Sequence, residues 1–413
     1  MANTVLNASI IAKESLAILD NELGWLTKLH RGYEDEFAQK VNGYKVGDTI
    51  SIRRPHDPRP RTGNVMSVAD VIEGKLDITV DTQVGHDFQF SSTDMTLKID
   101  DLSERVIKPA MINIVNHIAA DVMSTMYKGF YNWVGTPGQL VNSFADFAKA
   151  PERMDEMTIP QTDRCTILSP SDYWSMLGNQ ASLYIQGAAN SAYRQGELGQ
   201  VGGLDTYMSQ LTPTHTVGDH GGTPLVRGAD QNVTYDTAKN TWTQTLATDG
   251  WSTSKALKAG DVFTITGVYM VNARTKAKTT ILQQFVITGD VTTNASGTSA
   301  TNLTISPPII ISGPHQTVDA APADDAPITM MGTAVTGYKQ NLAFHKNAMA
   351  LVVVPMEMPA AAYNGERRSH KGFSVRVIPV YDGTNDISKW RLDVLYGKKL
   401  IDPRLGLRYS GTS

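Results

Sequence analysis

The sequence predicts an α+β protein that is interrupted by a separate all-β domain. Residues 101–126 carry apolar side chains at three- and four-residue spacing, which is the pattern of one long amphipathic helix. Short strand-like runs separated by Thr, Asn, Gly and Asp fill residues 223–335. Mixed helix and strand patterns return on both sides of that region, so we expect the β domain to be an insertion into one larger domain.

The segment before the long helix is expected to form an arm and a loop. Apolar spacing between residues 3 and 29 predicts a helix. Alternation around Ile50 and again around Ile78 predicts a two-stranded loop within residues 43–90, with a turn-rich stretch at 55–63. Prolines and arginines make that stretch too stiff and too polar to form a core of its own, so the loop needs a surface to lie against.

The long helix has a clear N-terminal signal. Asp101 and Glu104 resemble a capping box, and an acidic first turn suits the helix dipole. A helix of about 25 residues would be roughly 37 Å long, which suits the spine of an elongated domain. Pro109 is expected either to kink the first turns or to mark the true start of the helix.

Shorter elements complete the α+β part. Helices are expected at residues 140–149 and 172–177, and strands at 164–168, 349–354, 373–380 and 390–396. The clean alternation within residues 373–377 indicates a strand with one buried face.

The β domain is expected to be a sandwich or a small barrel. Its predicted strands are residues 232–235, 242–246, 262–271, 280–287 and 303–311. The acidic, proline-containing segment 316–327 is expected to be an exposed loop.

Composition limits the possible functions. The 413 residues include 37 basic and 41 acidic side chains, and the formal charge of −4 lacks the basic excess of a dedicated nucleic-acid binder. No apolar stretch approaches the roughly 20 residues that span a bilayer, and no secretion signal precedes the first helix, so synthesis in the cytoplasm is expected. The single cysteine, Cys165, excludes an intrachain disulfide and is expected to be a small buried hydrophobe.

Motifs that could carry chemistry have simpler explanations. The glycines at 196, 199, 202 and 203 lack the Lys-Ser/Thr ending of a phosphate loop and predict a turn. His215 and His220 have no ligand partner at helical spacing, so we expect exposed loop histidines rather than a metal site. Ser169 and Ser171 lack a nucleophile elbow. The sequence therefore predicts no catalytic residue, no metal and no cofactor.

The loop carries the candidate functional residues, because guanidinium groups crowded among prolines gain order by pairing with carboxylates. The candidates are Arg53, Arg54, Arg59 and Arg61 on the loop, with Glu34, Asp35 and Glu36 as possible acidic partners. We expect ion pairs between these groups on neighbouring subunits, and a solvated loop is the alternative.

Several segments together resemble one family. Residues 341–351 (NLAFHKNAMAL) look like a strand entered through a His-Lys-x-Ala segment, and residues 372–377, 382–385 and 390–397 look like a closing hairpin. Residues 193–205 and 211–218 are similar to a turn into an apical domain. The order of parts resembles the major capsid (coat) proteins of tailed bacteriophages, with the Hong Kong 97 capsid fold. It looks most like the podovirus-type subgroup with an immunoglobulin-like or telokin-like insertion.

The resemblance implies a structural protein, not an enzyme, that self-assembles into the icosahedral shell around a double-stranded DNA genome. Its implied partners are copies of itself in hexamers and pentamers, a scaffolding protein and a portal protein. Packaged DNA would be contacted only weakly and without specificity, no membrane would be involved, and the protein would reside in the virion after synthesis in the host cytoplasm.

The implied division of the chain has seven parts. They are an N-terminal arm (1–42), an extended β loop (43–99), a peripheral domain with the spine helix (100–137), an apical domain (138–222), the inserted β domain (223–335), the apical return (336–371) and the closing strands (372–413).

The alternative function is a soluble hydrolase or a carbohydrate-binding protein with a β-sandwich module, favoured only by Trp242, Trp251 and Tyr269.

Overall fold

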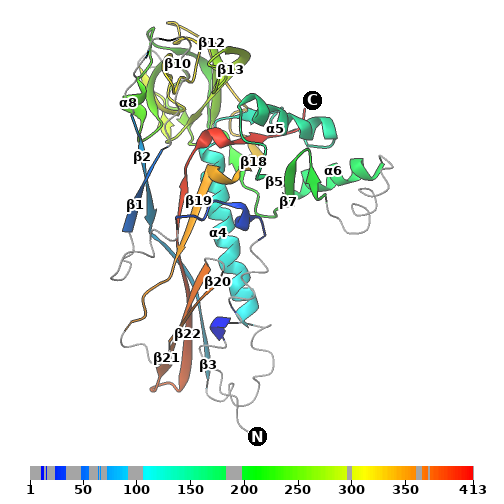
Figure 1. Cartoon of the computed structure of the whole chain (residues 1–413), viewed down its shortest axis with the longest axis vertical. Coiled ribbons are helices and arrows are strands. Elements are labelled where there is room, and N and C mark those ends of the chain that lie inside the picture. Colours follow the sequence, from blue (N-terminus) through cyan, green and yellow to red (C-terminus); the bar gives the residue numbers. More distant parts are fainter. Residues whose placement is uncertain are drawn as a thin grey trace. The chain divides into compact units, whose positions relative to one another are not determined.

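The chain forms two compact units, which are described separately. The computed structural model describes residues 11–13, 15, 24–33, 48–54, 64, 66, 72–91, 106–182, 198–294, 300–359, 365–370 and 373–412. The first unit comprises Met1–Ser51, Asp77–Val122 and Met349–Lys399, and the second comprises Ile52–Leu76, Met123–Ala348 and Leu400–Ser413. Figure 1 gives the labels of their helices and strands.

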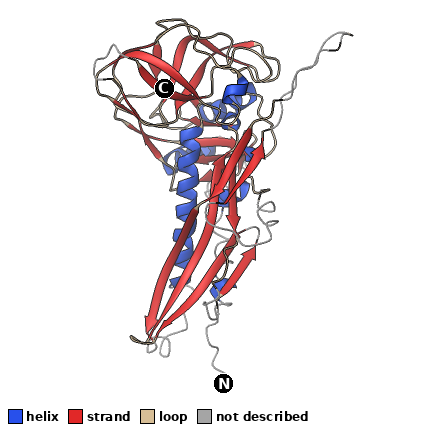
Figure 2. Ribbon diagram, turned by 90° about the vertical axis from the view of Figure 1, so that its left-hand side faces the viewer, coloured by secondary structure: helices blue, strands red, loops and turns tan. Residues whose placement is uncertain are grey.

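A five-stranded sheet organises the first unit. Its strands are β3 (Thr82–Ser91), β19 (Met349–Val354), β20 (Glu366–His370), β21 (Phe373–Asp382) and β22 (Ile387–Leu400). The order is β19-β22-β21-β20, and β3 also pairs with β22, antiparallel from Ile387↔Ser91 to Tyr396↔Thr82. Figure 1 labels β3, β21 and β22, and Figure 2 draws all strands in red. The three predicted C-terminal strands are confirmed. The segment of β3, which we expected to belong to the loop, is instead part of this sheet.

Helix α4 (Lys108–Gly129) confirms the predicted spine helix. Pro109 lies in its first turn, where the missing N–H needs no partner, so the proline marks the start of the helix. Asp101 and Glu104 of the expected capping box lie outside the described residues. The predicted apolar stripe is buried at Ala110, Met111, Ile114, Val115, Ile118, Ala119, Val122, Met123 and Met126.

Strand β21 corrects one expectation about burial. Residues 373–378 are all buried, so the polar side chains Ser374 and Arg376 do not face solvent as the alternation suggested. Arg376 donates a hydrogen bond to the Asp393 carboxylate at 2.6 Å, and Arg391 donates to the same carboxylate at 2.8 Å. These ion pairs compensate the charge of a polar strand face that is removed from water.

The predicted two-stranded loop is also present. Strand β1 (Asp48–Arg53) pairs with β2 (Lys75–Val80). The turn-rich stretch 55–63 lies outside the described residues. Of the helix expected at 3–29, residues Gly24–Lys28 form a short 3-10 helix, η1, and most of the remainder lies outside the described residues.

The tip of the β21–β22 hairpin is expected to loosen in acid. The Asp382 carboxylate accepts hydrogen bonds from Asn385, Lys389 and the Thr384 backbone, in that order of influence, and they lower its pKa to about 2. A lowered pKa stabilises the folded turn above the unfolded value of 3.8, and this contribution is lost as the pH falls towards about 2. We expect pepsin cleavage at the tip to accelerate across that interval. Asp382→Asn should show a smaller acceleration, because only the pH dependence of pepsin itself remains. An equal acceleration in this variant would contradict the assignment.

A six-stranded mixed sheet organises part of the second unit. Its strands are β4 (Trp133–Val134), β5 (Arg164–Leu168), β6 (Gln200–Val201), β7 (Leu204–Met208), β18 (Asn341–His345) and β23 (Gly406–Tyr409), in the order β4-β23-β18-β5-β7-β6. Strands from before residue 210 and after residue 340 therefore share one sheet. The strand expected at 164–168 is confirmed, and Cys165 within it is buried, as predicted.

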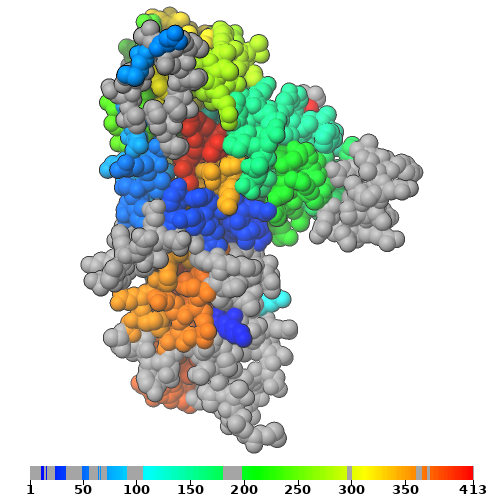
Figure 3. All heavy atoms as spheres, in the orientation of Figure 1, coloured from blue at the N-terminus to red at the C-terminus, as the bar shows by residue number. Residues whose placement is uncertain are grey.

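Helices α5 (Phe144–Glu156) and α6 (Pro170–Ser182) confirm the two helices expected here, and they lie next to one another (Figure 3). Phe147, Met154 and Met176 from these helices pack with Leu407 and Tyr409 of β23 in one apolar core. Helix α5 starts later than expected because Ser143 caps it, accepting a hydrogen bond from the Asp146 backbone N–H at 3.1 Å.

A second six-stranded sheet, formed by residues 222–330, is antiparallel. Its strands are β9 (Gly222–Val226), β10 (Gln244–Trp251), β12 (Val262–Val271), β13 (Lys278–Ile287), β15 (Thr301–Ser306) and β16 (Ile328–Met330), in the order β16-β12-β13-β15-β10-β9. A bridge between Leu225 and Pro327 brings the two edges together, so we call this sheet the barrel. Closure satisfies the edge strands and encloses an apolar core.

Two expectations about the barrel are wrong. Residues 232–235 do not form a strand, and Tyr235–Ala238 form a short helix, α8, instead. The segment 316–327 is not simply an exposed loop, because Val318 and Ala326 are buried in the barrel core and Val318 bridges Met270. The burial of these two small apolar side chains therefore determines the position of the segment, in spite of its acidic composition.

Short elements connect these layers. They are β8 (Thr214–Thr216) paired with β17 (Gly337–Lys339), β11 (Ala256–Leu257) paired with β14 (Val291–Thr292), and the 3-10 helices η3 (Lys346–Ala348) and η4 (Pro403–Leu405). The β8–β17 pair joins the chain just before the barrel to the chain just after it. The glycines at 202 and 203 form the tight β6–β7 turn, both at positive φ, as the turn prediction required.

Candidate functional site

The predicted arginines of the loop have different surroundings. Arg53 is at the surface, with 82% of its side chain exposed, and forms an ion pair with Glu73 at 3.1 Å. Arg54 is partly buried, and its guanidinium carbon lies 5.6 Å from the ring centroid of Trp242. Burial lowers the pKa of Arg54, while the nearby Asp402 carboxylate acts in the opposite direction. Arg53, the last residue of β1, therefore faces solvent, and Arg54, which follows it, faces the protein interior.

The other predicted contact residues cannot be placed. Arg59, Arg61, Glu34, Asp35 and Glu36 all lie outside the described residues. Pairing of the loop arginines with acidic groups of a neighbouring copy stays a prediction.

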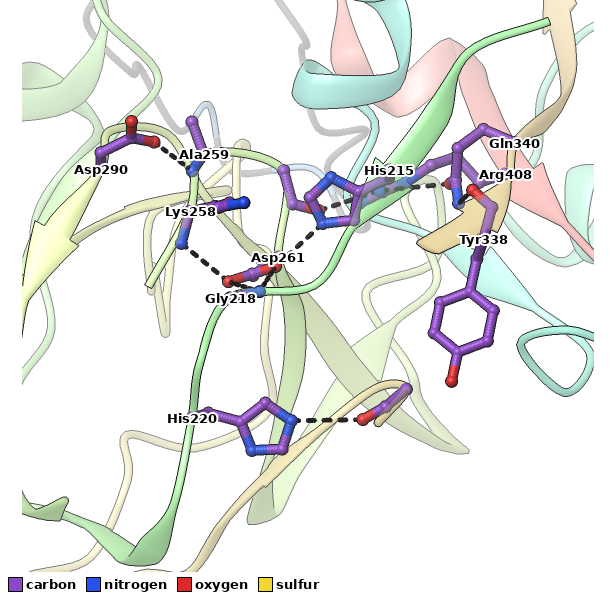
Figure 4. Close-up of polar contacts among 12 residues, drawn as sticks. His215, Gly218, His220, Lys258, Ala259, Asp261, Asp290, Tyr338, Gln340 and Arg408 are labelled. Carbon is purple, nitrogen blue, oxygen red and sulfur yellow. Dashed lines mark hydrogen bonds and ion pairs between the residues drawn. The ribbon is translucent and has the colours of Figure 1, made fainter. Parts of the chain in front are cut away.

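A buried carboxylate joins the barrel to the segment that precedes it (Figure 4). Asp261, at the start of β12, accepts hydrogen bonds from the Lys258 backbone at 2.8 Å and from the Gly218 backbone at 3.0 and 3.1 Å. His215 Nε2 lies 2.8 Å from the same carboxylate, which only accepts when ionised, so this nitrogen carries the proton. Because both oxygens are occupied by donors, the buried charge is satisfied.

The backbone approaches this carboxylate too closely to admit larger residues. A Cβ atom at Gly218 would lie 2.5 Å from Asp261 Oδ2 and 2.8 Å from the Ala256 carbonyl oxygen. Gly260 has φ of +103°, and a Cβ there would come within 3.1 Å of the His215 ring. Glycine at these positions lets the two segments meet.

A buried arginine lies on the other side of the same junction. Arg408 Nη1 donates to the Gly260 carbonyl at 2.9 Å and to Gln340 Oε1 at 3.4 Å, and the guanidinium lies 5.2 Å from the Trp133 ring centroid. Burial lowers the pKa of Arg408 to about 9, and Asp261 opposes this shift. Strand β23 is thereby tied to the barrel.

Gln284 adds a further link between the barrel and β4. Its Oε1 accepts from the Trp133 backbone N–H at 2.7 Å, and its Nε2 donates to the Trp133 carbonyl at 2.8 Å. Together we call Asp261, His215, Arg408 and Gln284, with their partners, the barrel junction. It connects the barrel to segments on both sides of it in the chain.

The junction corrects our expectation for two histidines. His215 is 2% exposed, and His220 is partly buried with Nε2 3.2 Å from the Gly332 carbonyl oxygen, so neither is a solvent-exposed loop residue. The partner of His215 is a carboxylate 46 positions away in the sequence. Spacing along one helix could not reveal it. The only feature of the sequence that pointed to this partner was a polar residue, Asp261, directly before a strongly apolar strand.

The described part of the chain offers no catalytic arrangement. Among these residues there is no group of three or more metal-ligating side chains. Ser169 hydrogen-bonds with Asp172 at the start of α6, which is a helix-capping contact, and no histidine completes a triad there in the described contacts. No described helix is long and apolar enough to cross a bilayer.

Sequence comparison identifies the family. A profile of the P22 coat protein, gene protein 5, matches residues 27–411. The chain belongs to this family. A relative named major capsid protein, from Acyrthosiphon pisum secondary endosymbiont phage 1, is 23% identical over 388 residues and is matched over 89% of either chain. The prediction of a phage major capsid protein with the α+β, Hong Kong 97-type fold is confirmed by membership of the P22 coat protein family.

This member of the P22 coat protein family is also similar to solved structures. A structure from Mycobacterium phage Che8 is 10% identical, covers 93% of this chain and 90% of its own, and has a TM-score of 0.47. The CUS-3 coat protein I-domain is 28% identical, covers 27% of this chain and 98% of its own, and has a TM-score of 0.20.

Proposed function

We propose that many copies of this chain close an icosahedral shell around a double-stranded DNA genome, as hexamers and pentamers. The observation that carries the proposal is the match to a coat-protein family over residues 27–411. Capsid proteins associate with copies of themselves, and many weak contacts of one kind give a stable shell while single errors can still dissociate. The near-neutral charge of −4 suits a container that contacts DNA weakly and without specificity.

Finer parts of this function belong to the same proposal. The protein works without catalysis, cofactor or membrane, is made in the host cytoplasm and is incorporated into the virion. A scaffolding protein directs assembly, and a portal protein occupies one vertex. We also propose that the chain belongs to the podovirus-type subgroup, with residues 223–335 as an inserted domain between the apical segments 138–222 and 336–371. The arm (1–42), the loop (43–99), the spine-helix region (100–137) and the closing strands (372–413) complete this division.

The alternative of a soluble hydrolase or a carbohydrate-binding protein with a β-sandwich module loses its support. It relied on aromatic side chains of the β domain, but Trp242 and Trp251 are both only 3% exposed. The ring of Tyr269 lies under the Lys278 ammonium, 4.0 Å from the ring centroid. An exposed aromatic platform is therefore missing among these three residues.

Electron microscopy of purified protein tests the main proposal. We expect closed particles of regular size, and sedimentation should show megadalton species or monomers that assemble when concentrated. A protein that stays a small globule with its scaffolding partner present would refute the shell.

Arg53→Glu tests the proposed contact of the loop arginines with a neighbouring copy. Arg53 is exposed, so we expect unchanged thermal stability of the free protein and a loss of closed shells of about fivefold, because the same repulsion recurs at every copy. The shells are counted in micrographs. Glu73→Gln breaks the same internal ion pair without reversing charge and should assemble normally. Normal assembly of Arg53→Glu would refute the contact.

A further inference from the structure

The turn that follows α8 receives one strand of the loop. The Lys75 backbone N–H donates to Asn240 Oδ1 at 3.0 Å. A Cβ atom at Gly74 would lie only 2.2 Å from the carbonyl oxygen of Lys239. The backbone of the loop therefore meets the backbone of the barrel at a separation that only glycine permits.

On the other side of the loop, the Arg54 side chain contacts the barrel close to the same turn. The Arg54 backbone N–H donates to the Gly74 carbonyl at 2.7 Å, so the two strands are still paired at this level. The Arg54 guanidinium then lies over Trp242, whose indole is buried. A cation over an indole face is favourable, and more so where water is excluded.

Two residues of η4 and its cap complete the contact. Arg404 also lies over Trp242, 5.1 Å from the ring centroid, and hydrogen-bonds to the Asp402 carboxylate at 2.8 Å. Burial acts to raise the pKa of Asp402, but Arg404 and Arg54 lower it overall. Two guanidinium groups beside one ring would repel each other without this carboxylate. The Asp402 carboxylate therefore lets the Arg54 guanidinium lie beside the ring that Arg404 already contacts.

We propose that these residues form a docking site on the barrel for the chain's own loop. We call it the loop anchor, and it comprises Arg54, Gly74 and Lys75 on the loop with Lys239, Asn240, Trp242 and Asp402. It holds Arg54 and Gly74, the two residues that flank segment 55–73, and this segment carries Arg59 and Arg61. The barrel contributes to assembly by holding the residues that flank this segment in a fixed position. This inference rests on the proposed shell function.

The opposite directions of the Arg53 and Arg54 side chains support this docking site. Arg53 faces solvent while Arg54 faces Trp242, so the strand has one free side and one docked side. Residues 52–76 also belong to the same compact unit as the barrel, although they precede it by more than one hundred and forty positions. The loop ends and the barrel therefore belong to one compact unit.

Two variants of the full-length chain test the loop anchor. Asn240→Ala removes an exposed acceptor, and Gly74→Val blocks the close approach to Lys239. We expect hydrogen exchange at the Lys75 amide to accelerate about tenfold in Asn240→Ala, because its hydrogen bond is lost. In both variants regular shells should fall at least severalfold in micrographs, while circular dichroism stays near that of the wild type. In Asn240→Ala the thermal midpoint should also stay near the wild-type value, because the lost acceptor is exposed.

Matched controls separate this effect from general damage. Gly289→Val adds the same side chain where no atom lies within 4 Å, and Arg53→Ala removes the exposed neighbour of Arg54. Both should leave exchange at Lys75 unchanged, and Gly289→Val should assemble normally. Unchanged exchange in Asn240→Ala, or normal shells from both anchor variants, would overturn the inference. A wild-type chain that forms no shells would refute the proposed function instead, and the exchange results would still decide whether the anchor exists.

Discussion

Asp261→Ala is expected to lower the free energy of unfolding of the second unit by about 3–5 kcal/mol, because it leaves several buried groups without their partner. The backbone N–H groups of Gly218 and Lys258 and the ring of His215 would lose their acceptor. The buried Arg408 would lose the carboxylate that offsets its burial. The thermal midpoint should fall by roughly 10 °C, measured by calorimetry on the unassembled protein.

Asp290→Ala provides the matched comparison. Asp290 also accepts a backbone hydrogen bond, from Ala259 at 2.8 Å, but it is exposed and lies at the edge of the same region (Figure 4). Water can replace a lost exposed acceptor, so we expect a cost of at most about 1 kcal/mol. Equal losses of unfolding free energy in the two variants would mean that burial of the Asp261 network adds nothing to its contribution to stability.

Gly135→Ala is expected to cost about 2–5 kcal/mol, from backbone strain together with overpacking. Gly135 follows β4 with φ of +86°, and a Cβ there would lie 2.1 Å from the carbonyl oxygen of Ser410. The C-terminal segment would have to move, although the Ser410 backbone N–H donates to the Val134 carbonyl at 2.9 Å. Denaturant titration of the free protein measures the loss.

Gly203→Ala separates the two causes of that cost. Gly203 has a similar φ of +79°, but no atom lies within 4 Å of its Cβ position. Only the strain of the left-handed conformation applies, about 1–2 kcal/mol. If Gly203→Ala were as damaging as Gly135→Ala, close contact with the C-terminal segment would not be the reason for glycine at 135.

Elements with a strong local pattern could be predicted from the sequence. Helix α4 has a continuous apolar stripe, and β12 and β5 are apolar runs bounded by turn residues, so local periodicity alone indicated them. Strand β3 was missed as part of a sheet because its partner, β22, lies about three hundred positions later. Nothing in residues 82–91 themselves distinguishes a loop strand from a sheet strand.

The polar contacts were less predictable than the elements. Arg54 and Arg53 look equivalent in the sequence, yet one contacts Trp242 and the other faces solvent, because neighbouring side chains of a strand point to opposite faces. Likewise, His215 looked like a loop histidine because its partner, Asp261, belongs to the barrel. Such pairings depend on tertiary structure that composition and spacing do not encode.

The position of β18 has a consequence for synthesis. In the mixed sheet of the second unit, β18 lies between β5 and β23, but the ribosome makes it only after the entire barrel. A nascent chain that has reached Lys339 contains every barrel strand, whereas β5 still has no neighbour on one side. The barrel can therefore fold first, and a product truncated at that point should be captured by chaperones or degraded through its unpaired strand edge.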